Sequence, residues 1–454
     1  MRLFVKLGAV VEYLRGSLWF GPTVAVVVAV VLGVVLTGVR PSESSLLESL
    51  TFSGSAEGAG GILRVIATSV ITINTLVFSL TVLTLQLASQ QFSPRLLRTF
   101  LREGRNQVVL GVFLATFVYA LVVLRAVRSG PSPNEDVPRL AVTVAFLFLL
   151  ATIVAFVTFI DHIAQSLRID TLIRQVEKDT RSVIDAQHPE PRRPGGEPPV
   201  SAPPADAVPV PARRSGFVTA VATKSLERLA LRHDVVLALA PKVGERVVEG
   251  SPLVLAWRGR EGDGLPEAES LAKGVHDAVT ISFERTMQQD IAYGLRQLVD
   301  VAVKALSPGV NDPTTAVHAL GHLTSILCVL VGRDLSPLIQ SDGDGVTRVV
   351  VPTRGLKDYL DLACRQIRVY GARDPVVAVE LLHLLRDVGR CATRHEDCRA
   401  VRDQALMVVA AAEREIVETH DMDAVRRAAA AVDGALVHGH SGRRPAPSGE
   451  IGLR

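Results

Sequence analysis

Four long apolar segments constrain the fold of this chain more than any other feature. The first runs from Trp19 to Val39 without a charged residue, which is long enough for a helix to cross a hydrocarbon core of about 30 Å. The predicted transmembrane helices are residues 19–39, 65–88, 108–127 and 140–160. Because a bilayer offers no water to unpaired backbone groups, these segments predict an α-helical membrane domain over residues 1–160.

The remainder of the chain has the composition of a soluble protein. The sequence as a whole is 48% hydrophobic and 21% charged, and its long apolar runs are concentrated in the first 160 residues. The chain is therefore expected to be an integral membrane protein that carries a large soluble region. A net charge of +3 is small for this length, so we expect no nucleic-acid partner.

The distribution of Lys and Arg predicts the orientation of the membrane domain. An even number of spans places both termini on the same side. Eleven basic residues lie on that side: Arg2, Lys6, Arg15, Arg95, Arg98, Arg102, Arg105, Arg168, Arg174, Lys178 and Arg181. Five lie on the other: Arg40, Arg64, Arg125, Arg128 and Arg139. The positive-inside rule then predicts a bacterial plasma-membrane protein with cytoplasmic termini and a cytoplasmic soluble region.

The second span carries a stripe of polar side chains at helical spacing. Its members are Thr68, Thr72, Asn74, Thr75, Ser79 and Gln86. Such a stripe is expected to face protein or water rather than lipid. It fits either helix packing, for which Ser and Thr are well suited, or a water-lined path.

A basic amphipathic helix is expected at the inner membrane surface after this span. Ser93-Pro94 is a helix-start signal, and Arg95, Arg98, Arg102 and Arg105 follow at three- and four-residue steps. Contact with anionic lipids is one expected role for these four side chains. Guidance of anions to a pore mouth is the alternative.

Changes in composition predict the organisation of the soluble region. Apolar spacing beyond span four predicts a helical stalk over residues 161–185, and nine prolines predict an irregular linker over 186–214. Short Val-rich runs predict a small β module over 215–285, and three- to four-residue apolar spacing predicts a helical bundle over 286–438. Residues 439–454 are expected to form a disordered tail. The predicted fold class is thus a four-span α-helical membrane protein with a cytoplasmic α+β region.

The segment "GERVVEGSPL", residues 244–253, resembles the hammerhead of biotinyl/lipoyl-like barrel-sandwich modules. In that pattern, Gly244 and Gly250 would form tight turns around a short strand. The resemblance implies a small barrel-sandwich-like β module. Lys224 and Lys242 lack the hairpin-tip context of a carrier lysine, so no covalent cofactor is expected, and no other cofactor is expected.

The segment "ALSPGVNDPTTAV", residues 305–317, contains more helix-breaking residues than the apolar runs on either side. Pro308 should end one helix, Gly309 permits a left-handed turn, and Asp312 with Pro313 should cap and begin the next helix. These rules do not account for Asn311, Thr314 and Thr315, which lie beside a helix N-terminus. The segment is either a helix stop and start or a ligand loop formed by Asn311, Asp312, Thr314 and Thr315.

The cysteines give weak evidence for a metal site. Four cysteines without disulfide-like spacing fit a reducing compartment. Cys391, His395 and Cys398 have the spacing C-x3-H-x2-C, and His383 or Cys364 would have to supply a fourth zinc ligand. A turn near Gly389 would break this geometry, and structural zinc sites usually have paired ligands, so no metal is expected.

Two segments carry a family resemblance. They are "LQLASQQFSPRLLRTFLREGRNQVVLGVFLATFVYALVVLR" (residues 85–125) and "RTMQQDIAYGLRQLVDVAVKALSPGVNDPTTA" (residues 285–316). With them the chain resembles a bacterial family of predicted membrane proteins, domain of unknown function 2254, over nearly its whole length. The resemblance implies four membrane spans followed by a cytoplasmic region, and it implies no reaction, ligand or catalytic residue.

The sequence favours an oligomeric channel or transport-like unit that is gated by its cytoplasmic region. The polar stripe of span two and the size of the soluble region are the grounds for this expectation. A non-conducting membrane-anchored scaffold or ligand sensor is the alternative. No recognised catalytic motif is present, so an enzyme is not expected, although catalytic residues scattered along the chain would leave no such motif. The expected partners are the bilayer, its anionic lipids and further copies of the chain.

Overall fold

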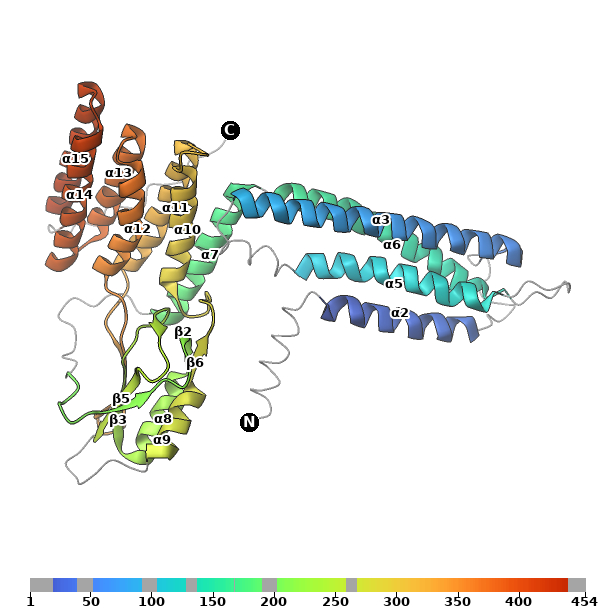
Figure 1. The fold of residues 1–454 in the computed structure, drawn as a ribbon, viewed down its shortest axis with the longest axis horizontal. Coiled ribbons are helices and arrows are strands. Elements are labelled where there is room, and N and C mark those ends of the chain that lie inside the picture. Colours follow the sequence, from blue (N-terminus) through green and yellow to red (C-terminus); the bar gives the residue numbers. More distant parts are fainter. Residues whose placement is uncertain are drawn as a thin grey trace. The chain divides into compact units, whose positions relative to one another are not determined.

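The computed structural model describes residues 19–38, 52–91, 104–127, 137–166, 168–189, 202–258 and 268–439. Contacts divide the chain into two compact units, residues 1–171 and residues 172–454. Figure 1 shows the helices and strands of both units with their labels.

The membrane unit consists of long apolar helices that cover the four predicted spans. They are α2 (Phe20–Gly38), α3 (Ala56–Gln91), α5 (Gly104–Ala126) and α6 (Arg139–Ser166). Helix α5 packs against all three others and has the largest buried share of the four. Small residues allow α2 to approach it closely: a Cβ on Gly33 would lie 2.9 Å from Val122 Cγ1, and a Cβ on Gly111 would lie 3.3 Å from Ala25 Cβ.

Polar side chains inside the membrane unit bond across helices. The hydroxyls of Thr116 on α5 and Thr152 on α6 are both fully buried and lie 2.9 Å apart. The Tyr119 hydroxyl on α5 donates to the Ala141 carbonyl on α6 at 3.0 Å, and its ring lies 5.0 Å from that of Phe148. These contacts satisfy polar groups that would otherwise be unpaired in an apolar interior.

Five helices in the described part of the chain are long and apolar enough to cross a membrane. Four belong to the membrane unit, and the fifth is α11 (Pro313–Val331) in the second unit. Length and composition alone therefore do not give the predicted count of four. The apolar side chains of α11 pack inside the second unit, where Leu320, Leu323, Ile326, Leu327 and Leu330 are fully buried.

The region expected to be a helical stalk forms two helices. Helix α6 ends at Ser166, and α7 begins at Ile169 and ends at Gln187. Between them, the Arg168 amide donates to the Gln165 carbonyl and the Thr171 amide donates to the Arg168 carbonyl. These three-residue turns interrupt the four-residue α-helical ladder. The predicted stalk is therefore helical but is made of the end of α6 and of α7 rather than of one helix.

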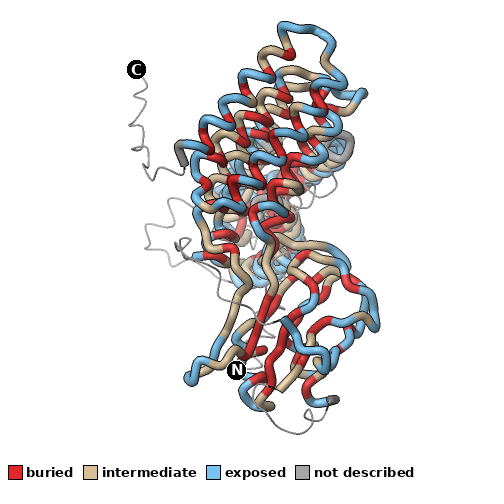
Figure 2. The backbone as a smooth tube through the Cα atoms, turned by 90° about the vertical axis from the view of Figure 1, so that its left-hand side faces the viewer, coloured by how far each residue is buried: buried red, intermediate tan, exposed pale blue. Residues whose placement is uncertain are grey.

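Helices α10 to α15 form three antiparallel hairpins that stack side by side (Figure 1). Their bounds are α10 Ile291–Ala305, α11 Pro313–Val331, α12 Leu356–Gly371, α13 Pro375–Cys391, α14 His395–Glu415 and α15 Thr419–Gly439. Helix α10 packs on α12 and α12 on α14, while α11 packs on α13 and α13 on α15. Figure 2 shows buried residues recurring along the helices of this stack. The predicted bundle is thus a short stack of hairpins like those in helical-repeat proteins.

The strands of the second unit form two sheets. One has the order β1-β5-β3-β8-β7, in which only β3 and β8 run parallel, and the other has the antiparallel order β4-β2-β6. The strands are β1 Val208–Pro211, β2 Gly216–Val221, β3 Val235–Leu239, β4 Arg246–Val247, β5 Pro252–Arg258, β6 Val279–Ser282, β7 Leu338–Ser341 and β8 Thr347–Val351. Two helices, α8 (Thr223–His233) and α9 (Ala268–Ala278), pack on each other and contact these strands.

Three features of the β region differ from the sequence-based expectation. The range 215–285 contains α8 and α9 as well as strands. Strand β1 lies inside the predicted linker, where prolines are tolerated because β1 is an edge strand. Strands β7 and β8 lie inside the range predicted to be helical, and they complete the five-stranded sheet.

The glycine turns predicted around a short strand are confirmed. Gly244 and Gly250 have φ angles of +84° and +82° and flank β4. A Cβ on Gly244 would lie 2.0 Å from Asp290 Oδ2, so both its backbone conformation and its surroundings require glycine.

Gly294 provides a test of how α7 packs on the hairpin stack. A Cβ at this position would lie 2.0 Å from Thr180 Oγ1 on α7. We predict that Gly294→Ala lowers the free energy of unfolding by about 1–3 kcal/mol in denaturant unfolding of the solubilised protein, as expected for overpacking. Adding Thr180→Ala should recover part of the loss. Gly321→Ala is the matched control, since nothing lies within 4 Å of its added Cβ. Equal effects of Gly294→Ala and Gly321→Ala would refute this packing.

Candidate functional site

Five polar residues of span two lie on the side of α3 that faces away from the other described helices of the membrane unit. The buried side chains Leu63, Ile66, Val70 and Val77 define its packed face. Thr68, Thr72, Thr75, Ser79 and Gln86 are all exposed and follow steps of three, four and seven residues on the opposite face. We call these five residues the polar face of α3. Packing among the described residues of the membrane unit does not explain the polar face.

Two threonines of the polar face satisfy their hydroxyls within the helix. The Thr72 hydroxyl donates to the Thr68 carbonyl at 2.9 Å, and the Thr75 hydroxyl donates to the Ile71 carbonyl at 3.0 Å. Such bonds lower the cost of a hydroxyl in an apolar environment. Their oxygens keep a free lone pair, so they can still accept a hydrogen bond from water or from a neighbouring helix.

Asn74 does not belong to the polar face, although the sequence placed it beside these residues. Helical spacing puts it on the same side as Val70 and Val77, and its side chain is half-buried. Its Oδ1 atom is buried and has no hydrogen-bond partner among the described residues. Asn74 is therefore a polar group directed into the membrane unit.

The predicted basic helix falls almost entirely outside the described residues. Arg95, Arg98 and Arg102 lie in the range 92–103, which the structure does not describe. Arg105 lies near the start of α5. The two roles expected for these arginines remain predictions.

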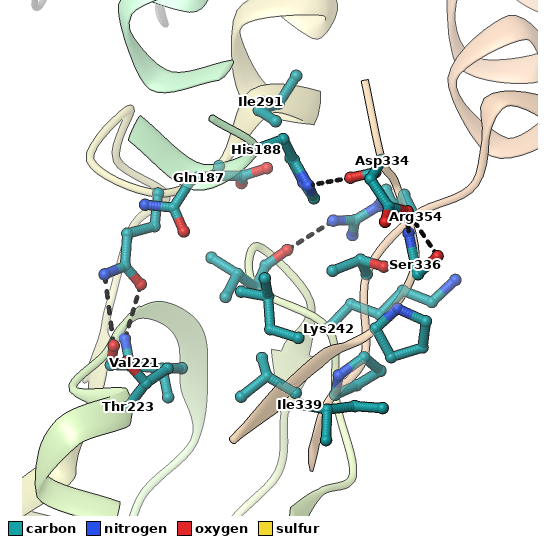
Figure 3. A pocket seen from close by; sticks show the side chains of 18 of the residues that line it. Gln187, His188, Val221, Thr223, Lys242, Ile291, Asp334, Ser336, Ile339 and Arg354 are labelled. Atoms are coloured by element: carbon teal, nitrogen blue, oxygen red, sulfur yellow. Dashed lines mark hydrogen bonds between the residues drawn. The ribbon is translucent and has the colours of Figure 1, made fainter. Parts of the chain in front are cut away.

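The second unit, residues 172–454, which was predicted to be soluble and is called the soluble unit below, contains a cavity of about 870 Å³ that the sequence did not reveal. The end of α7, the start of α10, the β7–β8 hairpin and the Lys242-Val243 turn contribute residues to its wall. Figure 3 shows ten of these residues labelled around the opening. Its charged lining residues are Lys242, Asp290, Asp334, Arg354 and Arg394. Both signs of charge are thus present, together with several amides and hydroxyls, which suits a polar ligand of drug-like size.

Asp290 anchors one wall of the cavity. Its carboxylate, 2% exposed, accepts from the Tyr293 amide at 3.2 Å as the N-cap of α10. Arg285 forms an ion pair with it at 2.7 Å and stacks over the Tyr293 ring. Burial raises the pKa of Asp290, whereas Arg285 opposes this shift. The buried pair fixes the start of α10 beside the Gly244 turn.

Arg354 and His188 hold other parts of the same cavity together. Arg354 Nη1 donates to the Val243 carbonyl at 2.6 Å, and His188 Nδ1 lies 2.7 Å from the Asp334 carbonyl (Figure 3). Burial lowers the pKa of His188. The neutral ring therefore donates from Nδ1, which connects the chain after α7 to the segment before β7.

The segment around Asn311 is a helix stop followed by a capped helix start. Helix α10 ends at Ala305, and Asp312 caps α11 by accepting from the Thr315 amide at 3.1 Å and from its hydroxyl at 2.6 Å. The predicted left-handed residue was wrong: Asn311, not Gly309, has positive φ, at +50°. Asparagine is one of the few residues that tolerate this conformation. Asn311 thus has a conformational role that the sequence rules left unassigned.

The residues considered for a metal site lie on two helices. Cys391 is the last residue of α13, while His395 and Cys398 begin α14, and the Cys398 thiol donates to the Ala392 carbonyl at 3.8 Å. No group of three His, Cys, Asp or Glu side chains in the described part of the chain is arranged to hold a metal ion. Asp312 and Thr315 are engaged with each other, and Thr314 follows Pro313 in the first turn of α11.

The conformational role of Asn311 can be tested by two substitutions. Asn311→Ala should cost about 1 kcal/mol of unfolding free energy, because alanine is strained at positive φ. Asn311→Gly should preserve stability, because glycine adopts this conformation readily. Denaturant unfolding would measure both. An equal loss in the two variants would instead show that the amide side chain makes a required contact.

His188 predicts a pH dependence of stability. Its pKa is lower in the folded protein than the ordinary value of 6.5, so the unfolded chain binds the proton more readily. The contribution of neutral His188 to stability is complete above pH 6.5. It is lost as the pH falls from 6.5 towards the lower pKa of the folded protein. The thermal midpoint of His188→Asn should therefore fall less between pH 7 and pH 5 than that of the wild type. His420→Asn, at an exposed position of α15, should behave like the wild type.

A family model and curated relatives both match most of the chain. The family model described as "Predicted membrane protein (DUF2254)" matches residues 15–387. Uncharacterised proteins of Mycobacterium bovis and Mycobacterium tuberculosis are each 38% identical over 425 residues, which cover 93% of this chain and 81% of each relative. No solved structure matches the chain. Since the match covers most of the chain, including both segments in which the resemblance was found, this protein belongs to the DUF2254 family of predicted membrane proteins.

Proposed function

We propose that this protein is a bacterial inner-membrane protein whose membrane units associate through the polar face of α3 to form an oligomeric channel or transport-like unit. The observation that carries the proposal is the exposure of Thr68, Thr72, Thr75, Ser79 and Gln86 opposite the packed face of that helix. The polar face extends over several helical turns. It is therefore suited to a helix of another copy or to water.

Helix association and a water-lined path are compatible roles for this surface. Small hydroxyl residues let helix backbones approach closely, and their free lone pairs can accept bonds from a neighbouring chain. If several copies surround an axis with their polar faces inward, the same hydroxyls can line a hydrated path. No ionisable side chain lies on the polar face, which favours passive conduction over a proton relay.

Four spans with both termini in the cytoplasm form part of the proposal. Helix α11 is apolar enough to span, but it lies within the hairpin stack between α10 and α13 and carries His322, which bonds to Glu177 of α7. These contacts support a place for α11 in the soluble unit. The excess of Lys and Arg at the termini supports a cytoplasmic soluble unit, with the arginines of residues 95–105 facing anionic lipids.

We further propose that the soluble unit controls the membrane helices. Helix α7 begins three residues after the end of α6, and its last residues line the cavity. A ligand bound there would contact the same helix that follows the last span. The β region is interpreted as barrel-sandwich-like on the strength of the Gly244 and Gly250 turns around β4.

The second candidate function is a non-conducting membrane-anchored scaffold or ligand sensor. The cavity favours it, because a polar pocket of about 870 Å³ in the soluble unit needs no pore in order to bind a ligand. In this alternative the polar face of α3 serves only to hold copies together.

Chloride efflux from liposomes tests conduction. The wild type should release chloride faster than empty liposomes, and Thr75→Val should slow the efflux roughly fivefold if its hydroxyl contributes about 1 kcal/mol to a hydrated path. Thr158→Val is the matched control: Thr158 is also exposed, lies on α6 and bonds to its own backbone. Equal efflux from wild-type and empty liposomes, for chloride and for potassium, would contradict the channel and favour the scaffold or sensor.

Cross-linking tests the association separately from conduction. Thr72→Cys should form disulfide-linked dimers in membranes, because the polar faces of two copies would meet. Thr158→Cys should not. Cross-links through Thr72→Cys without ion flux would support the scaffold alternative, whereas equal cross-linking of the two variants would refute association through the polar face.

A further inference from the structure

Two basic side chains of the cavity wall, Lys242 and Arg354, carry more hydrogen-bond donors than their described contacts use. The Arg354 guanidinium donates to the Val243 carbonyl at 2.6 Å and lies 3.6 Å from a carboxylate oxygen of Glu245. The Lys242 ammonium lies 2.9 Å from the carboxylate of Asp358. A guanidinium and an ammonium each have several N–H groups, so both side chains can bind a further acceptor.

The turn that follows β3 brings these two side chains together. Val243, whose carbonyl accepts from Arg354, is the next residue after Lys242. The Glu245 carboxylate accepts from the Lys242 backbone amide at 2.9 Å, and its other oxygen faces Arg354. Figure 3 shows Lys242 and Arg354 on the same side of the cavity. Two positive charges are thus held at one turn.

The carboxylates that pair with these cations are more exposed than the cations themselves. The side chains of Glu245 and Asp358 are 44% and 46% exposed. Those of Arg354 and Lys242 are only 18% and 32% exposed, and both line the cavity. Ion pairs with partly exposed partners contribute little to stability, so an anion in the cavity can compete for both cations.

The two acidic residues of the cavity wall are engaged within the wall. Asp290 is buried and forms an ion pair with Arg285 at 2.7 Å. The Asp334 carboxylate accepts from the amide and the hydroxyl of Ser336 at 3.0 Å and 2.6 Å. The Lys242 side of the cavity therefore presents positive charge to a ligand.

We propose that the cavity binds a small, water-soluble phosphate ester whose phosphate group is held by Lys242 and Arg354. A phosphate dianion matches two positive charges, and its oxygens suit both a planar guanidinium and an ammonium. A cavity of about 870 Å³ is much larger than a phosphate group, and Ile291, Ile339 and Val351 give it apolar walls for an organic body. This inference rests on the ligand-binding role proposed for the cavity and names the class of ligand.

Lysine footprinting of the full-length, solubilised protein tests the site. Acetylation by an N-hydroxysuccinimide ester is followed by mass spectrometry at constant ionic strength, with AMP, pyrophosphate or adenosine as the probe. AMP near saturation should slow acetylation of Lys242 roughly fivefold, because only the unbound fraction reacts. Pyrophosphate should also slow it, whereas adenosine, which lacks a phosphate group, should not.

Lys304 is the internal control for this measurement. It is exposed in the last turn of α10, at the opposite end of that helix from the cavity residue Ile291. Its acetylation should be the same with and without each probe. No protection of Lys242 by either AMP or pyrophosphate, equal protection by adenosine, or equal protection of Lys304 would overturn the proposal.

Two variants test the assigned contacts by titration calorimetry. Lys242→Gln and Arg354→Gln should each weaken AMP binding about tenfold, because each removes a charge-assisted contact to the phosphate group. Lys304→Gln should bind AMP as the wild type does. Lys242→Gln is expected to fold normally, since it loses only a partly exposed ion pair, and it decides the result if Arg354→Gln does not fold. Wild-type affinity in Lys242→Gln would contradict the proposed site.

Footprinting and efflux together distinguish a failure of this inference from a failure of the proposed function. Protection of Lys242 by AMP without any effect of AMP on chloride efflux would support the phosphate site and contradict control of the membrane helices through the cavity. Chloride efflux without protection of Lys242 would contradict the phosphate site and leave the channel standing.

Discussion

The absence of water in the hydrocarbon core is the constraint on which the rest of this structure depends. Inside the membrane unit, Thr116, Thr152 and Tyr119 meet the constraint by bonding between α5 and α6. The polar face of α3 meets it only in part, through bonds to its own backbone. A surface of this kind costs more in contact with lipid than in contact with another helix or water. Among the described residues of the membrane unit nothing covers this polar surface, and the association of copies proposed above would cover it.

In the second unit, the apolar helix α11 is covered by other helices of the same unit. It lies at the centre of the hairpin stack, where α10 and α13 cover it. Its length and hydropathy match those of a membrane helix, and its buried share equals that of α5, so none of these measures identifies its medium. Apolar length alone thus indicates burial without identifying the medium.

Sequence rules predicted the parts of the fold that depend on local chemistry. The long apolar helices, the Asp312 cap and the two glycine turns around β4 all follow from residues within a few positions of one another. The sequence rules failed for elements whose formation depends on residues far apart in the chain. Strand β8 pairs in parallel with β3, more than a hundred residues earlier, and its Arg348 bonds to Asp234 and Asp342. The turn Asp342–Gly345 followed by a run of valines was a hairpin signal that could have revealed β7 and β8.

The candidate sites likewise divide into features that local sequence predicts and features that depend on distant contacts. The stripe of α3 could be read from periodicity, but the exposure of its polar face and the inward position of Asn74 depend on which helices pack against α3. The cavity could not be predicted at all, because it collects residues from several elements. Asn311 was noted as a candidate ligand residue, and that role stays a prediction; its φ of +50° gives a conformational reason for its identity.

Helix α7 connects these separate observations. Thr180 packs against Gly294 of α10, Glu177 bonds to His322 of α11, and the residues at the end of the helix line the cavity. A ligand in the cavity would thus change the surroundings of a helix that begins three residues after the end of α6. If the second unit controls the membrane helices as proposed above, α7 is the element through which a bound ligand would act.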